Sequence, residues 1–108
     1  VRRIEAGFPP VVFASNADSG RQLKADVLHN DLALTGGGAT VAVIDSQVDL
    51  HPEFGDRLRR TRPGTADFHG THVAGTVAAA GNNPDLKGIA PAAKLVTTSF
   101  RTIPEGVE

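Results

Sequence analysis

Hydrophobic and polar positions divide the middle of the chain into a short series of predicted elements. Residues 40–44 form an unbroken β-branched and apolar run, which is typical of a strand buried on both faces in a parallel sheet. Residues 93–100 predict a second buried strand. Between the two, residues 71–80 predict a helix of small side chains that ends where Gly81 follows. The order strand, helix, strand predicts a right-handed parallel crossover. It therefore predicts an α/β fold, a partial doubly wound parallel sheet with flanking helices.

The residues before the first predicted strand form a less regular part of the chain. Residues 20–30 predict one short helix, because apolar side chains recur there at helical spacing. These side chains are Leu23, Val27 and Leu28. We therefore divide the chain into residues 1–35, an N-terminal lead-in with a short helix, and residues 36–108, the α/β portion.

Composition and charge narrow the classes of function. The 108 residues are 40% hydrophobic and 21% charged, with a formal net charge of -1, so neither nucleic acid nor a membrane is expected as a partner. No apolar run approaches the roughly 20 residues that span a bilayer, and there is no signal peptide in the chain. The absence of cysteine excludes disulfides and thiolate metal sites. The absence of methionine favours a piece of a longer protein.

Asp45 and His69 are the candidate catalytic residues. Asp45 directly follows the first predicted strand, and His69 stands at the amino end of the predicted helix. Catalytic groups of an open parallel sheet lie beyond the carboxyl ends of its strands, so these two side chains are expected to meet. A carboxylate that accepts a hydrogen bond from an imidazole fixes the tautomer and leaves the other ring nitrogen available as a base. From the residues alone, a turn-capping aspartate and an ordinary histidine stay open as an alternative interpretation.

Four motifs surround these two residues in order along the chain. They are Val41-Ala42-Val43-Ile44-Asp45-Ser46, His51-Pro52-Glu53-Phe54, His69-Gly70-Thr71-His72-Val73-Ala74-Gly75-Thr76 and Gly88-Ile89-Ala90-Pro91-Ala92-Ala93-Lys94-Leu95. Together, over about residues 36–96, they resemble the N-terminal part of the catalytic domain of subtilisin-like serine proteases (subtilases, peptidase family S8).

The resemblance implies a function and a set of roles. Asp45 would be the orienting carboxylate, His69 the general base, and His72 a structural neighbour. Residues 36–108 would be the N-terminal portion of a truncated subtilisin-like domain. The whole enzyme would be a secreted or cell-envelope serine endopeptidase that acts on protein or peptide substrates. No cofactor is certain. A structural calcium ion is a property that the family suggests, and residues 81–85 offer suitable oxygens, although a polar turn is the favoured interpretation of them.

Several residues depart from the family pattern or explain it locally. Gln47 stands where the family usually has glycine, and would be strained if its φ were positive. Phe68 stands where a glycine often precedes the catalytic histidine. The stretch 46–68 leaves little room for the usual second strand. Gly70 and Gly75 are expected to let the helix approach the sheet closely.

The nucleophile is the largest departure. The family carries its serine in a later Gly-Thr-Ser-x-Ala segment, which this chain lacks. Its four serines, none in that context, are Ser15, Ser19, Ser46 and Ser99. The expected partner is therefore the remainder of a catalytic domain that carries the serine. We expect the chain alone to be inactive, and poorly stable because its sheet would keep an unpaired edge and an uncovered face.

Two other classes of function stay open. His69 and His72, three positions apart, could bind zinc with Asp45, although the His-Glu-x-x-His pattern of zinc helices is absent. A degenerate, noncatalytic subtilase-like binding fragment is the second alternative. In that case a basic stretch could bind a partner, although a solvated face is the default interpretation. The sequence does not decide whether this stretch is an edge strand or a loop. Its residues are Arg57, Arg59, Arg60 and Arg62.

Overall fold

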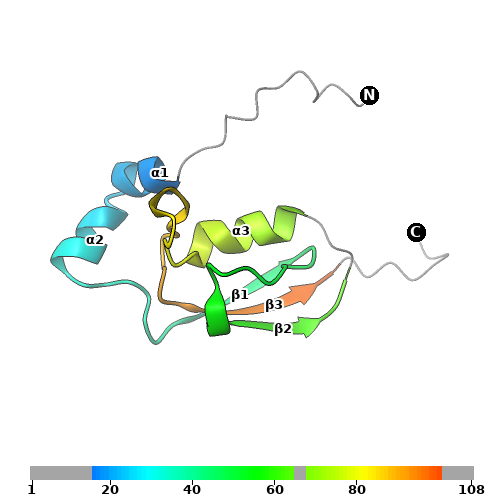
Figure 1. The fold of residues 1–108 in the computed structure, drawn as a ribbon. Helices are drawn as coiled ribbons and strands as arrows, with labels where there is room; N and C mark the ends of the chain where they lie inside the picture. Colours follow the sequence, from blue (N-terminus) through cyan, green and yellow to red (C-terminus); the bar gives the residue numbers. More distant parts are fainter. Residues whose placement is uncertain (1–15, 65–67, 101–108) are drawn as a thin grey trace, which may run out of the picture.

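The computed structural model describes residues 16–64 and 68–100 as a short run of helices and strands (Figure 1). In chain order these are α1 (Asn16–Gln22), α2 (Ala25–Asp31), β1 (Thr40–Asp45), the 3-10 turn η3 (Gly55–Arg57), β2 (Leu58–Arg62), α3 (Phe68–Ala78), the 3-10 turn η4 (Pro84–Leu86) and β3 (Lys94–Ser99). In this described part, no helix has the length and apolar character needed to cross a bilayer.

The three strands form one parallel sheet in the order β1-β3-β2, so β3 lies between two strands that precede it in the chain. This confirms the predicted α/β class. Val43 pairs with Thr97 and Asp45 with Ser99, which brings the ends of β1 and β3 to the same edge of the sheet. The expectation that residues 46–68 have little room for a strand is wrong, because β2 forms within them as an outer strand of this sheet.

One face of the sheet is covered by α3, and the core lies between them (Figure 1). Its buried members are Val43, Val48, Phe54, Ala74, Ala78, Ala93 and Leu95. Alanines dominate the helix side of this core, because a helix with short side chains can lie close to the strands beneath it. The helix predicted over residues 71–80 begins earlier, at Phe68. His69 therefore lies in its first turn.

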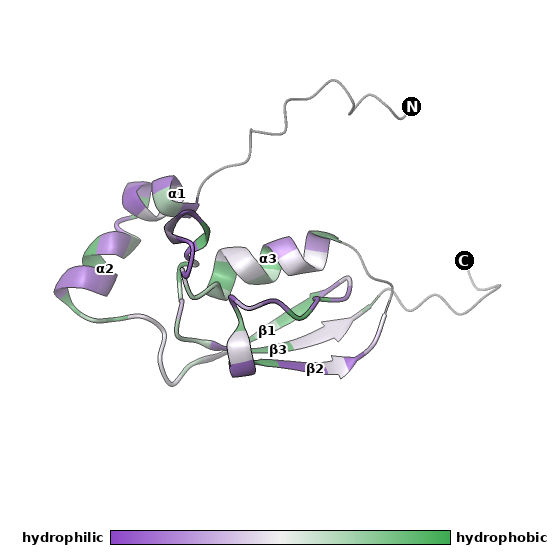
Figure 2. Cartoon of the chain, viewed as in Figure 1, coloured by the Kyte–Doolittle hydropathy of each residue, from purple (hydrophilic) through white to green (hydrophobic). Residues whose placement is uncertain are grey.

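The opposite face of β1 is exposed in the described structure. Ile44 is 68% exposed and Ala42 is exposed, so the prediction of a strand buried on both faces is wrong for these residues. β1 is nevertheless strongly hydrophobic, whereas β2 is largely hydrophilic (Figure 2). The apolar residues of β1 therefore fit a second covering layer that the described residues do not supply.

The predicted helix 20–30 is in fact two helices. The chain breaks at Lys24, whose φ of 65° is left-handed, and α2 then ends at Asp31. The apolar side chains that predicted this helix are exposed, so they form no buried face here. Two hydrogen bonds instead hold α1 and α2 to the segment after α3. Asn16 Nδ2 donates to Leu86 O at 3.3 Å, and His29 Nε2 lies 2.8 Å from Ile89 O.

Candidate active site

Asp45 ends β1 with a carboxylate that its own neighbour holds in place. The Ser46 N–H donates to Asp45 Oδ1 at 2.6 Å, and the Ser46 hydroxyl donates to the same oxygen at 3.3 Å. The side chain of Asp45 is only 16% exposed. Ser46 therefore orients this carboxylate independently of any contact with a histidine.

His69 meets this carboxylate from the first turn of α3. Its Nδ1 lies 2.8 Å from Asp45 Oδ1, so the two predicted site residues are brought together. A carboxylate accepts hydrogen bonds, so Nδ1 carries the proton and donates it. This bond and the bond from the Ser46 N–H hold the pKa of Asp45 below the usual value of an aspartate. The imidazole itself is 64% exposed. The pair thus combines a fixed anion with an accessible ring.

Ser46 also fixes the start of α3, a role that the sequence did not indicate. Its buried hydroxyl accepts a hydrogen bond from the Gly70 N–H at 2.8 Å. The backbone is so close at this point that a Cβ on Gly70 would lie 2.3 Å from the Ser46 carbonyl oxygen. Only glycine fits there, as predicted. The same expectation for Gly75 is wrong, because no described atom outside its own helix backbone and chain neighbours lies within 4 Å of a Cβ there.

These two glycines give a matched test of the approach between α3 and β1. Gly70→Ala is expected to destabilise the fold by about 2–3 kcal/mol or more, because the clash is with rigid backbone. Gly75→Ala is expected to be neutral or to stabilise α3 by up to about 1 kcal/mol, because alanine favours a helix. Thermal unfolding of both variants measures the difference. Equal melting temperatures for the two would contradict the close contact at Gly70.

Gln47 is accommodated without the strain considered above. Among described residues other than glycine, only Lys24 and Ala33 have a positive φ, so the backbone of Gln47 does not require glycine. Its side chain has a contact of its own, because Gln47 Oε1 accepts the Gly64 N–H at 3.1 Å. Gln47 therefore ties the turn after Asp45 to the segment that follows β2.

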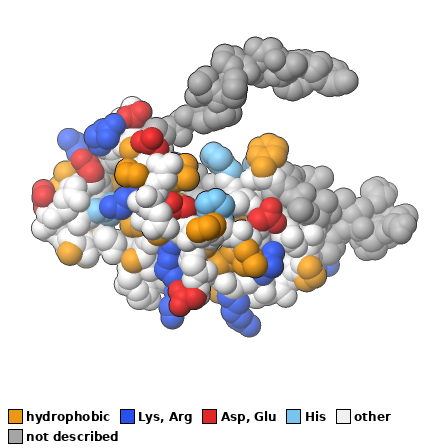
Figure 3. Space-filling model, viewed as in Figure 1, with side chains coloured by type: hydrophobic (Ala, Val, Ile, Leu, Met, Phe, Trp, Pro, Cys, Tyr) orange, Lys and Arg blue, Asp and Glu red, His pale blue; other side chains and the backbone are white. Residues whose placement is uncertain are grey.

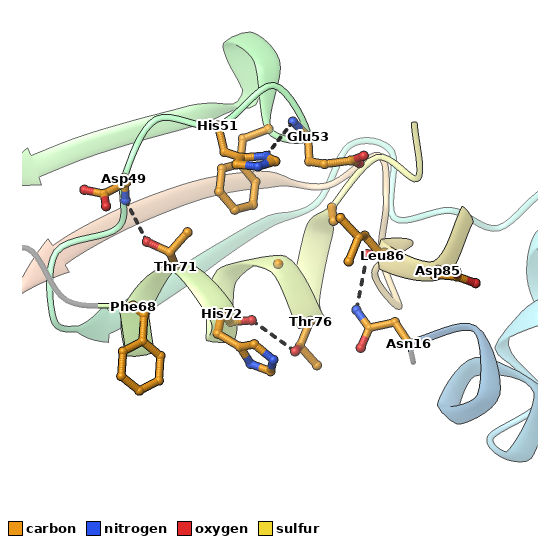
Figure 4. Close-up of a pocket in the computed structure, with 13 residues that line it drawn as sticks. Asn16, Asp49, His51, Glu53, Phe68, Thr71, His72, Thr76, Asp85 and Leu86 are labelled. Carbon is orange, nitrogen blue, oxygen red and sulfur yellow. Dashed lines mark hydrogen bonds between the residues drawn. The ribbon is translucent and has the colours of Figure 1, made fainter. Parts of the chain in front are cut away.

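Phe68 and His72 lie on the outer side of α3, one helical turn apart (Figure 4). They line a cavity of about 420 Å³ together with residues of the segments around it, and Asp45 is not among its lining residues. Figure 3 shows histidine and hydrophobic side chains side by side on this part of the surface. Phe68 is 81% exposed. His72 thus lines a cavity to which neither Asp45 nor His69 contributes, which argues against the zinc interpretation.

The distribution of metal-ligating side chains leads to the same conclusion. Residues 16–64 and 68–100 contain no group of three His, Asp or Glu side chains that could hold a metal ion. Asp45, His69 and His72 therefore do not form a zinc site in this part of the chain.

The serines among the described residues do not have the surroundings of a catalytic nucleophile. Ser46 Oγ is buried and engaged with Gly70 and Asp45. Ser99 is 2% exposed at the end of β3, and Ser19 belongs to α1. Ser15 lies outside the described residues. None of the three described serines therefore combines exposure with a place beside the imidazole that a nucleophile needs.

Comparisons with known proteins point to one protein family. The family model described as the Subtilase family matches residues 36–106. Subtilisin BL from Lederbergia lenta is 41% identical over 80 residues, which cover 68% of this chain and 29% of the relative. Subtilisin E from Bacillus subtilis is 43% identical over 82 residues, with coverage of 68% and 21%.

A solved structure agrees in fold. The MycP3 protease from the type VII (ESX-3) secretion system matches with a TM-score of 0.62 and 26% identity, covering 94% of this chain and 30% of that one. The fold and the match to the family define a protein of the subtilisin-like α/β class. The chain belongs to the subtilase family. It spans less than a third of the length of the relatives that it matches.

Proposed function

We propose that this chain supplies the base and its orienting carboxylate to the active site of a subtilisin-type serine endopeptidase. The observation that carries the proposal is the 2.8 Å contact between His69 Nδ1 and Asp45 Oδ1 at the carboxyl end of β1. With Nδ1 engaged, Nε2 is the nitrogen that accepts the proton of a serine hydroxyl as that serine attacks a peptide carbonyl. Asp45 stabilises the imidazolium that results, and His69 then protonates the leaving amine.

The nucleophilic serine and the oxyanion hole belong, in this proposal, to the remainder of the catalytic domain. The support is twofold. None of the described serines has the surroundings of a nucleophile, and the relatives are more than three times as long as the region that they share with this chain. Nucleophile and base must lie within hydrogen-bonding reach of each other. In this proposal the 108-residue chain holds the base but not the nucleophile, so it has no activity of its own.

Proteins or peptides are the proposed substrates. Relatives of this chain carry the names "Alkaline protease" and "Serine protease AprX", the second 37% identical over 81 residues. A secreted or cell-envelope location is proposed on the same family grounds. Nothing in the charge of the chain, -1 overall, favours a nucleic-acid partner.

A serine-directed fluorophosphonate probe tests this division of the active site. The 108-residue chain is expected to remain unlabelled, whereas a longer protein that contains it is expected to be labelled at one serine outside the chain. Strong labelling of the shorter chain would show that the nucleophile is already present in it. An unlabelled longer protein would favour a noncatalytic subtilase.

A further inference from the structure

Glu53 is a buried carboxylate that the proposed catalysis does not use. It lies between β1 and β2, is 5% exposed, and points its carboxylate at the segment that follows α3. Three successive backbone N–H groups of that segment donate to it. Gly81 and Asn82 donate to Oε2 at 2.6 Å and 3.1 Å, and Asn83 donates to Oε1 at 2.9 Å. The carboxylate therefore gathers the chain just after the helix that carries His69.

Arg57 lies in η3, four residues after Glu53, and makes a second attachment to the connection between α3 and β3. Its guanidinium donates to Ala78 O at 2.9 Å and to Ala93 O at 2.8 Å, and also to the backbone oxygen of Glu53 at 2.6 Å. Glu53 thus accepts from N–H groups beyond α3, while Arg57 donates to the carbonyl groups at the end of α3 and before β3. Phe54, which lies between these two residues in the sequence, is buried in the core. Together, Glu53 and Arg57 fix both ends of the α3–β3 connection.

The geometry of this segment does not fit the calcium ion that the family suggests. Calcium requires about six to eight oxygen ligands around the ion. Here the backbone of residues 81–83 turns its N–H groups, not its carbonyl groups, toward the carboxylate. The side-chain oxygen of Asn83 is also engaged, since it accepts the Asp85 N–H at 3.1 Å. A cation placed against Glu53 would face three N–H dipoles of the wrong sign.

Gly81 permits this arrangement. Its φ of 89° is left-handed, which glycine adopts without strain, and a Cβ there would lie 2.9 Å from the Lys87 side chain. The turn therefore allows three consecutive N–H groups to converge on a single carboxylate. Such a concave set of N–H groups favours an anion, and the chain supplies that anion itself.

We propose that the Glu53 carboxylate holds residues 81–83 in place of a bound cation, so that this connection between α3 and β3 is independent of calcium. The proposal concerns the fold of the chain and does not depend on the proposed protease activity. Its direct consequence is that the stability contributed by Glu53 is the same in calcium and in a chelator.

The test compares the melting temperature of the protein and of its Glu53→Gln variant in calcium chloride and in EDTA. Glutamine keeps the size of the side chain but removes the charge and turns an NH₂ group toward N–H donors. The variant is expected to melt lower by roughly 5–15 °C, by the same amount in both solutions. Asp85→Asn is the matched control, because Asp85 is an exposed acid of the same segment, and it should change the melting temperature little.

Two outcomes would overturn the proposal. One is a calcium-dependent rise in the melting temperature of the unchanged protein that Glu53→Gln abolishes, since Glu53 would then be a metal ligand. The other is an unchanged melting temperature in Glu53→Gln. If the variant does not fold, amide hydrogen exchange of residues 81–83 in the unchanged protein decides the matter. Equal protection in calcium and EDTA supports the proposal, and faster exchange in EDTA contradicts it.

Discussion

His69→Ala is expected to lower peptide hydrolysis by about 10⁶-fold in a longer protein that includes the rest of the catalytic domain, a factor taken from subtilisin itself, a relative of this chain. The physical reason is that the serine hydroxyl is a weak nucleophile until a base removes its proton. His69 is placed for this role by its 2.8 Å bond to Asp45 and by the 64% exposure of its ring. Steady-state kinetics on a peptide substrate measure the loss.

His72 provides the matched control for this prediction. It is a histidine of the same helix, three residues on, but it lines the cavity on the outer side of α3. His72→Ala is therefore expected to keep turnover within about tenfold, because it touches neither Asp45 nor the proposed reacting atoms. An His72→Ala variant as inactive as His69→Ala, with both proteins folded, would show that the base has been assigned to the wrong histidine.

Asp45→Asn is expected to lower kcat by about 10⁴-fold, the size of effect known for the orienting carboxylate of serine protease triads. An asparagine can present its NH₂ group to Nδ1, which then becomes the acceptor and leaves the proton on Nε2. The imidazole would hold the tautomer that cannot act as a base toward serine. Substrate binding should change much less than kcat, because Asp45 would not contact the substrate.

The lowered pKa of Asp45 gives a separate prediction about the protonation of this carboxylate. Because folding depresses the pKa, the carboxylate supports His69 at every pH above the usual aspartate value, about 3.9. That support is lost only as the pH falls through the depressed value. In an acid titration of the folded protein followed by carboxyl ¹³C NMR, Asp45 should therefore show no protonation step between neutral pH and that usual value. A protonation midpoint of Asp45 above the usual aspartate value would contradict the observed bond.

The parts of the fold that the sequence predicted correctly depend on local patterns. The apolar run before Asp45 and the small residues after Gly70 specify β1 and α3 almost independently of the rest of the chain. The meeting of Asp45 with His69 then follows from the topology of a parallel sheet. The close contact of Gly70 was also predictable, because a helix that starts against the end of a strand leaves little room for a side chain there.

The parts that the sequence did not predict depend on contacts between distant segments. β2 is a basic stretch of weak strand character, and it becomes a strand by pairing with β3 more than thirty positions later. Glu53 reads as one residue of a motif, whereas its function comes from backbone N–H groups about thirty positions away. For Ile44 the sequence predicted burial that the described residues do not provide. An apolar pattern indicates the environment that a strand needs, but it does not identify the residues that supply that environment.

A structure of the longer protein after reaction with a fluorophosphonate tests the central claim most directly. The account predicts that the labelled serine comes from outside this chain. In the unlabelled protein, whose structure is determined in parallel, the Oγ of that serine should lie within roughly 2.6–3.2 Å of His69 Nε2. Asp45 should remain bonded to Nδ1 in the same structure. A labelled serine remote from His69, or one that belongs to this chain, would contradict the assignment of Asp45 and His69 as one half of a subtilase active site.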